Sequence, residues 1–97
     1  MTQQDTITIN GQWSDTDNAW VSEVIELTGS IYLEISLNEK GRCVIKKSNT
    51  IEGPWPKALI SSWTGPDFKI RVLPSTDRQF IKIYLTSEPN NIHYAYI

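Results

Sequence analysis

Hydrophobic and polar residues alternate along much of this chain with a period of two, the period of a β-strand that buries one face. The clearest example is Ile31–Leu37, in which four aliphatic residues are predicted to point inward and the residues between them outward. The same alternation predicts strands at Phe68–Leu73 and Gln79–Leu85. No longer window shows helical periodicity, so the pattern predicts an all-β protein.

Five further segments have the composition or the alternation of short strands. They are Thr6–Asn10, Ala19–Leu27, Arg42–Lys47, Ala58–Trp63 and Ile92–Ile97. Within the second of these the alternation slips between Val21 and Ile25, which predicts a β-bulge. Within the third, Cys43 and Ile45 are expected to face the core.

Glycine, proline and asparagine mark the turns between these segments. Asn38-Glu39-Lys40-Gly41 and Thr64-Gly65-Pro66-Asp67 are predicted turns. Asn49–Lys57 is predicted to be a loop, because Gly53-Pro54-Trp55-Pro56 cannot sit in a central strand. We therefore expect about eight short antiparallel strands in two sheets, an immunoglobulin-like or jelly-roll-like β-sandwich.

Composition agrees with this prediction and limits the organisation of the chain. The 97 residues include 26 β-branched residues (Ile, Val and Thr) but only three Ala, a balance that favours strands over helices. The length allows one domain, which we place at residues 6–97 after a loose polar lead-in at residues 1–5. No run of about 18 apolar residues is present, so no membrane-spanning helix is expected.

The net charge of −2 conceals a strong asymmetry along the chain. Residues 1–39 contain seven acidic residues and no Lys or Arg, whereas residues 40–97 contain nine basic and four acidic residues, so the two parts carry −7 and +5. Either these charges face one another across strands of one sheet, or they form separate acidic and basic faces suited to head-to-tail packing or to an oppositely charged partner.

Residues suited to catalysis are few. Cys43, the only cysteine, permits no intrachain disulfide and is expected to be a small core residue. His93, the only histidine, is expected to be either a surface residue or a hydrogen-bonded core residue. The sequence lacks a glycine-rich phosphate-binding loop and a serine nucleophile elbow, so we predict a non-enzymatic protein without catalytic residues or cofactor.

Two other sets of polar residues have a simple explanation and a functional one. Asp15-Thr16-Asp17-Asn18 is predicted to be a solvated turn, the alternative being a calcium site; it lacks the central glycine and distal glutamate of an EF-hand loop, so no metal site is predicted. Lys69, Arg71, Arg78 and Lys82, near Phe80 and Tyr84, resemble a strip for single-stranded nucleic acid. Because the protein is acidic overall, we interpret this strip as solubilising charge and expect no nucleic-acid partner.

Aromatic residues are the strongest sign of binding. Trp55 lies between two prolines, and it either folds back to close one end of the domain or serves as an exposed anchor for a protein or a sugar ring. Tyr94 and Tyr96 share one face of the last strand, as Phe80 and Tyr84 share one face of theirs. If these two strands are neighbours, the four rings form one aromatic strip. The predicted binding residues are Trp55, Phe80, Tyr84, Tyr94 and Tyr96.

The rhythm of strands and turns resembles that of the small immunoglobulin-like sandwiches of phage virion proteins and bacterial surface proteins. The resemblance implies a structural subunit that decorates or assembles into a larger particle, with a protein partner or further copies of itself. The alternative is a carbohydrate-binding module with Trp and Tyr platforms. Met1–Asp5 has no signal-peptide features. This start is compatible with synthesis in the cytoplasm and incorporation into such an assembly, and equally with a leader removed before residue 1, so no localisation is assigned.

Overall fold

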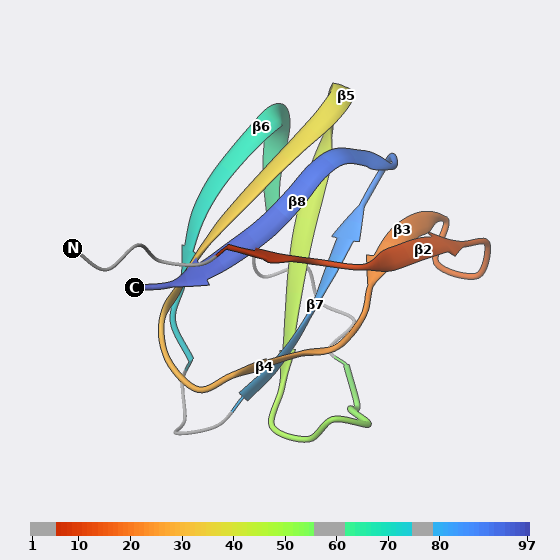
Figure 1. The fold of residues 1–97 in the computed structure, drawn as a ribbon. Coiled ribbons are helices and arrows are strands. Elements are labelled where there is room, and N and C mark those ends of the chain that lie inside the picture. Colours follow the sequence, from red (N-terminus) through yellow and green to blue (C-terminus); the bar gives the residue numbers. More distant parts are fainter. Residues whose placement is uncertain (1–5, 56–61, 75–78) are drawn as a thin grey trace.

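The computed structural model describes residues 6–55, 62–74 and 79–97, which form strands, turns and loops but no helix (Figure 1). The strands are β1 (Ile7–Thr8), β2 (Gly11–Ser14), β3 (Ala19–Ser22), β4 (Ile25–Leu27), β5 (Ile31–Ser48), β6 (Ser62–Val72), β7 (Gln79–Leu85) and β8 (Pro89–Tyr96). All the pairings are antiparallel, in the order β1-β8-β5-β7-β3-β2, with β4 on β7 and β6 on β5. The all-β prediction is confirmed.

The strands form one sheet curled into a half-barrel, and the two separate sheets of the predicted sandwich are not seen among the described residues. The difference arises at β5, a strand of 18 residues that we had divided into two. Its first part pairs with β8 and its second part with β7, while β6 pairs with both parts. A continuous strand therefore connects what the sandwich prediction placed in two sheets.

The predicted turns at residues 38–41 and 64–67 are bends within β5 and β6 (top of Figure 1). Ser36 faces Asp67 and Gly41 faces Gly65, so four residues of β5 stand opposite a single residue of β6. The connection between β7 and β8 follows the same bend, because the Thr86 amide donates to the Arg42 carbonyl at 3.2 Å. Turn-forming residues thus mark a change of direction here, and the pairing of β5 with β6 is interrupted between Ser36 and Gly41 and resumes beyond the bend.

The predicted strand Ala19–Leu27 is divided into β3 and β4, and the predicted bulge corresponds to the break between them. Val21 of β3 pairs with Tyr84, and Ile25 of β4 pairs with Ile81. Between these two pairs, the segment from β3 to β4 has one more residue than β7. The buried Ser22 hydroxyl compensates for the irregularity, since it accepts a hydrogen bond from the Ile83 amide at 2.9 Å and donates one to the Glu23 carbonyl at 2.8 Å.

The N-terminal segment joins the two ends of the sheet. β1 pairs with β8 and β2 with β3, and only Ile9 and Asn10 lie between β1 and β2. Both linking residues bond to the sheet: the Ile9 amide donates to the Ile92 carbonyl at 3.1 Å, and the Glu23 amide donates to the Asn10 carbonyl at 2.8 Å. We predicted the strand at Thr6–Asn10 but not β2, whose exposed residues show no buried face.

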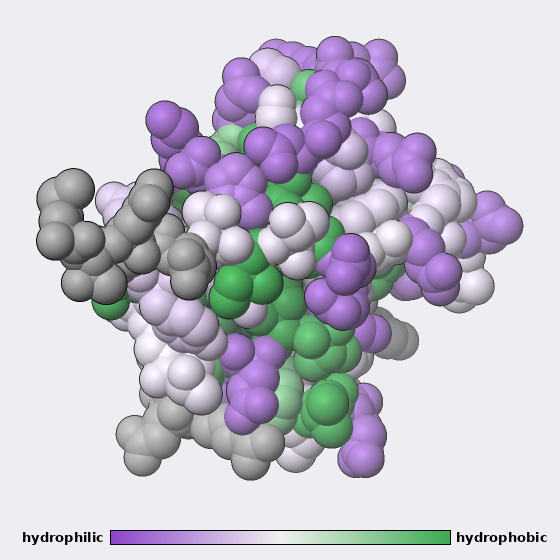
Figure 2. All heavy atoms as spheres, in the orientation of Figure 1, coloured by the Kyte–Doolittle hydropathy of each residue, from purple (hydrophilic) through white to green (hydrophobic). Residues whose placement is uncertain are grey.

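The core lies inside the half-barrel, on the side that the alternation predicts. The residues with no more than 2% exposure are Leu27, Ile31, Leu33, Cys43, Ile81, Ile83 and Leu85. Phe68, Ile70 and Val72 are buried beside them, as predicted. In the view of Figure 2, hydrophilic side chains cover the bend at the top, and the apolar surface gathers in the centre and lower half.

We predict that Ser22→Ala lowers the free energy of unfolding by about 1–3 kcal/mol, because it leaves the buried Ile83 amide without its acceptor. The matched control is Ser36→Ala, which removes a hydroxyl that donates to the exposed Asp67 carboxylate and should cost about 1 kcal/mol or less. Urea unfolding of both variants measures the difference. Equal losses would contradict the role given to Ser22.

A second prediction concerns the close approach of β2 to the core. A Cβ at Gly11 would overlap the indole ring of the buried Trp20, so Gly11→Ala should cost about 1–3 kcal/mol. At Gly29 the nearest atom to an added Cβ is a carbon of the Tyr96 ring at 3.7 Å, an ordinary contact. Gly29→Ala should therefore change thermal stability much less. A Gly11→Ala protein as stable as the wild type would show that the N-terminal segment is not held against the core.

Candidate functional site

The bend divides the outer side of the sheet, away from the core, into two surfaces. The first lies on β8, the first part of β5 and the second part of β6, and we call it the polar face. It comprises Tyr32, Glu34, Ser36, Asp67, Lys69, Arg71, Asn91 and His93. The second lies on β7, the second part of β5 and β3, and we call it the lysine–aromatic face. It comprises Val21, Arg42, Val44, Lys46, Phe80, Lys82 and Tyr84, with Trp55 at its border.

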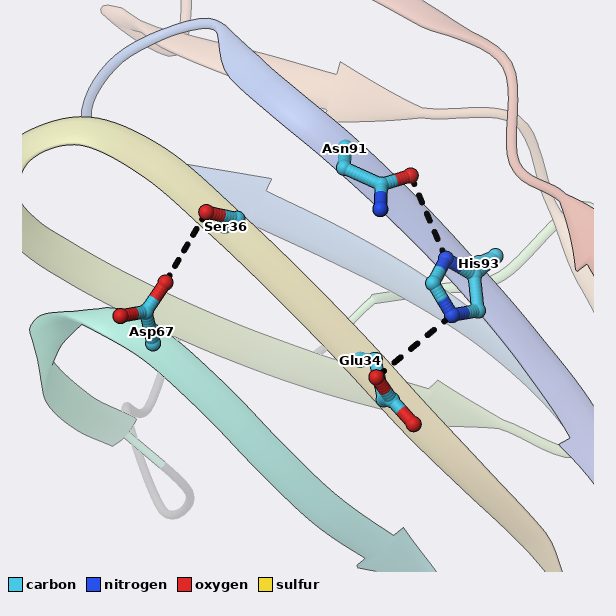
Figure 3. A network of polar contacts seen from close by, with 5 residues as sticks. All are labelled: Glu34, Ser36, Asp67, Asn91 and His93. Atoms are coloured by element: carbon cyan, nitrogen blue, oxygen red, sulfur yellow. Dashed lines mark hydrogen bonds and ion pairs between the residues drawn. The ribbon is translucent and has the colours of Figure 1, made fainter.

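The polar face carries two separate groups of polar contacts, one among Glu34, His93 and Asn91 and one between Ser36 and Asp67 (Figure 3). Nε2 of His93 lies 3.6 Å from Oε2 of Glu34, and its Nδ1 lies 3.2 Å from Oδ1 of Asn91. The Ser36 hydroxyl donates to Asp67 at 2.9 Å. These groups satisfy one another on the surface, so His93 is a hydrogen-bonded surface residue, one of the two predicted placements.

The lysine–aromatic face places two like charges side by side. Lys46 on β5 pairs in register with Lys82 on β7, an arrangement that is unfavourable between adjacent strands. Each ammonium group lies over a ring instead: Nζ of Lys46 is 4.6 Å from the centroid of Tyr84, and Nζ of Lys82 is 5.1 Å from that of Trp55. In the part of the chain that the structure describes, neither ammonium group has a carboxylate within ion-pair distance.

The loop after β5 positions Trp55. The Thr50 amide donates to the Ser48 hydroxyl at 3.2 Å, and the Gly53 amide donates to the Thr50 carbonyl at 3.2 Å. Gly53 has φ +94°, a conformation that favours glycine, and the peptide bond to Pro54 is cis. The indole folds back over Gly53 and beside Lys82, and it is half-buried. Trp55 therefore borders the outer face and retains some exposed surface, a position between the two predicted for it.

Two hollows separate this face from the turn between β2 and β3. A hollow of about 210 Å³ has Arg42, Lys46 and Tyr84 among its lining residues on one side and Asp17 on the other. A hollow of about 500 Å³ lies between Lys82 and the hairpin, with Asp17 also at its wall. Burial, and then the Asp17 carboxylate, raise the pKa of Tyr84, which keeps its phenol neutral. The face can thus offer cations, a phenol and apolar ring surface to an anionic ligand.

The turn itself holds its two carboxylates by local hydrogen bonds. The indole N–H of Trp13 donates to Oδ1 of Asp15 at 3.1 Å, and the Ser14 hydroxyl donates to Oδ2 of Asp17 at 2.9 Å. The Asp17 amide donates back to the Ser14 hydroxyl at 3.2 Å. Both carboxylates therefore take part in the turn, and the described residues contain no group of three or more metal-ligating side chains.

The single aromatic strip that the sequence suggested is not formed, because β5 lies between β7 and β8. Tyr94 and Tyr96 pack against the core, with ring centroids 6.0 Å apart and edge to face, and the Tyr96 hydroxyl donates to the Glu26 carbonyl at 3.1 Å. Phe80 and Tyr84 lie on the other side of the sheet, Phe80 buried and Tyr84 half-buried. Alternation assigns a face within each strand but says nothing of which strands are neighbours.

Two basic residues of the lysine–aromatic face were not identified from the sequence. Arg42 and Lys46 share a phase with Val44, so alternation within β5 was a signal that could have placed them together. The predicted basic strip is divided, because Lys69 and Arg71 lie on the polar face, away from Lys82. Arg78 lies outside the described residues.

Cys43 and His93 are not brought together. Cys43 is fully buried in the core, as predicted, whereas His93 is on the outer side of the sheet. Burial raises the pKa of the Cys43 thiol from 9.0 to about 12, so the thiol stays protonated at neutral pH.

The chain has no match among protein-family models, curated proteins or solved structures. Within the described residues, no helix has the length and apolar character required to cross a bilayer.

The raised pKa of Cys43 predicts a specific loss of stability in alkali. Above about pH 9 the unfolded chain releases the thiol proton while the folded protein retains it, so the free energy of unfolding falls until the pH approaches 12. By about pH 10.5 this effect should reach about 1–2 kcal/mol. Urea unfolding of wild type and Cys43→Ala at several pH values measures it. The stability difference between the two should shrink as the pH rises, and a constant difference would contradict the prediction.

Proposed function

We propose that this chain is a non-enzymatic interaction module, a small β-subunit that docks through its lysine–aromatic face to a protein partner within a larger assembly such as a virion or a cell-surface appendage. The observation that supports this most directly is the pairing of Lys46 with Lys82 across adjacent strands, each over an aromatic ring. Departures from local stability rules of this kind are typical of functional sites.

The chemistry of the face favours an acidic polypeptide as the partner. Carboxylates would relieve the repulsion between the two ammonium groups, and Arg42 adds a third positive charge close to Lys46. Trp55 and Tyr84 add rigid ring surface, which loses little conformational entropy on binding. The proposed roles are therefore charge pairing for the lysines and apolar anchoring for the rings.

The carbohydrate-binding alternative needs different properties. Sugars stack on open ring faces, whereas a lysine ammonium group already lies over the rings of Trp55 and Tyr84. Tyr94 and Tyr96 pack against the core and do not extend the surface. These contacts support a protein partner over a glycan.

We predict that poly-L-glutamate binds the wild-type chain at low salt and that Trp55→Ala or Lys82→Ala weakens this binding about tenfold, as measured by isothermal titration calorimetry. The matched control is Lys69→Ala, which removes one positive charge from the polar face and should leave the affinity within about twofold. Circular dichroism should show that Trp55→Ala keeps the β-fold, because its ring lies outside the core.

Two results would contradict the proposal. One is the absence of poly-L-glutamate binding, and the other is an equal loss of affinity in Lys69→Ala, which would indicate non-specific attraction. Titration with neutral oligosaccharides tests the alternative: binding that Trp55→Ala abolishes would indicate a carbohydrate-binding module.

A further inference from the structure

We infer that the acidic segment bound by the lysine–aromatic face is the turn between β2 and β3 of a second copy, so that copies of this chain associate head to tail. This inference deepens the proposed function and rests on it. It starts from two surfaces of the same molecule that are complementary in charge and in ring content.

The turn has the form of a ligand. The hairpin of β2 and β3 projects from the body of the molecule (right of Figure 1), and residues 15–18 at its tip are all exposed. Trp13 is 44% exposed, and its indole N–H holds Asp15 in place. The tip therefore presents an apolar ring beside a carboxylate, a pair that complements a ring beside an ammonium group.

The far end of the face is suited to receive this tip. Within one molecule, Asp17 already faces Arg42 and Lys46 across the smaller hollow, next to its own turn. Lys82 contacts Trp55, whereas Leu85 of the same strand pairs with Trp20, close to the turn. Lys82 and Leu85 are three residues apart on β7, which corresponds to about 10 Å of strand. Lys82 lines the larger hollow together with Asp17 and Glu23 of its own molecule, and no carboxylate of the described residues lies within ion-pair distance of its ammonium group.

Charge also limits which surfaces can meet in the contact. A two-fold contact through the face would place Lys46 and Lys82 against the same residues of the partner, and one through the turn would place Asp15 and Asp17 against each other. Both arrangements are repulsive, whereas a turn-to-face contact pairs opposite charges. The charge of the chain is distributed in the same way: residues 1–39, which include the turn, carry −7, and residues 40–97, which include the basic residues of the face, carry +5. A heterologous contact leaves one free face and one free turn, which can add further copies.

Two variants with complementary defects test this inference. Trp13→Ala/Asp15→Asn disables the turn and keeps the face, and Lys46→Gln/Lys82→Gln disables the face and keeps the turn. In multi-angle light scattering at low salt over about 10–500 μM, wild type should show a mass that rises with concentration, and each variant alone should stay monomeric. An equimolar mixture of the variants should form a 1:1 dimer and nothing larger, because it contains one working turn and one working face. Glu34→Lys, a charge reversal on the polar face, should associate like wild type.

Formation of the dimer also shows that both variants fold, so a loss of association cannot be attributed to misfolding. In about 0.5 M salt the wild-type association should weaken about tenfold or more. The inference is overturned if wild type is monomeric throughout, if either variant alone still associates, or if the mixture stays monomeric. Binding of poly-L-glutamate by a strictly monomeric wild type would overturn the second copy as partner while leaving the proposed function in place. Failure of both experiments would overturn both.

Discussion

The backbone pairing of β5 is the constraint on which the rest of the structure depends. Along its 18 residues it pairs with β6 on one side and with β8 and then β7 on the other. Because β5 pairs with β6 on both sides of the bend near Gly41, the apolar side of one sheet encloses the core. The outer side is turned into two separate surfaces by the same bend. The polar face and the lysine–aromatic face are therefore consequences of one strand changing direction.

Alternation along the chain was sufficient to predict which side of several strands faces the core. The inward side of Ile31–Leu37, the buried Cys43 and the bulge after Val21 all follow from local pattern, because burial repeats every second residue. The continuity of β5 was not predictable in this way, because the sequence at Gly41 is equally suited to a turn and to a bend. The distinction depends on hydrogen bonds to Gly65 and Thr86, which are distant in sequence.

The candidate site was predictable in part for the same reason. Phe80, Lys82 and Tyr84 were expected on one face from their spacing, and they share it. Their neighbours on that face, Lys46 above all, depend on strand order, which local pattern does not contain. The charge asymmetry also has two outcomes in the structure. Glu34 faces Lys69 across strands on the polar face, as one alternative expects, while Lys46 and Lys82 remain a concentrated positive charge, as the other expects.

The route of the N-terminal segment has a consequence for the order in which the sheet assembles. β1 pairs with His93 and Tyr94 of β8, and the Ile9 amide bonds to the Ile92 carbonyl, so these contacts join residues far apart in the sequence. Contacts of such long sequence separation are costly in loop entropy and form slowly. We therefore expect β1 to join the sheet after strands with short connections, such as β2 and β3, have paired. Until then the outer edge of β8 lacks its backbone partner and can pair with a strand of a neighbouring molecule.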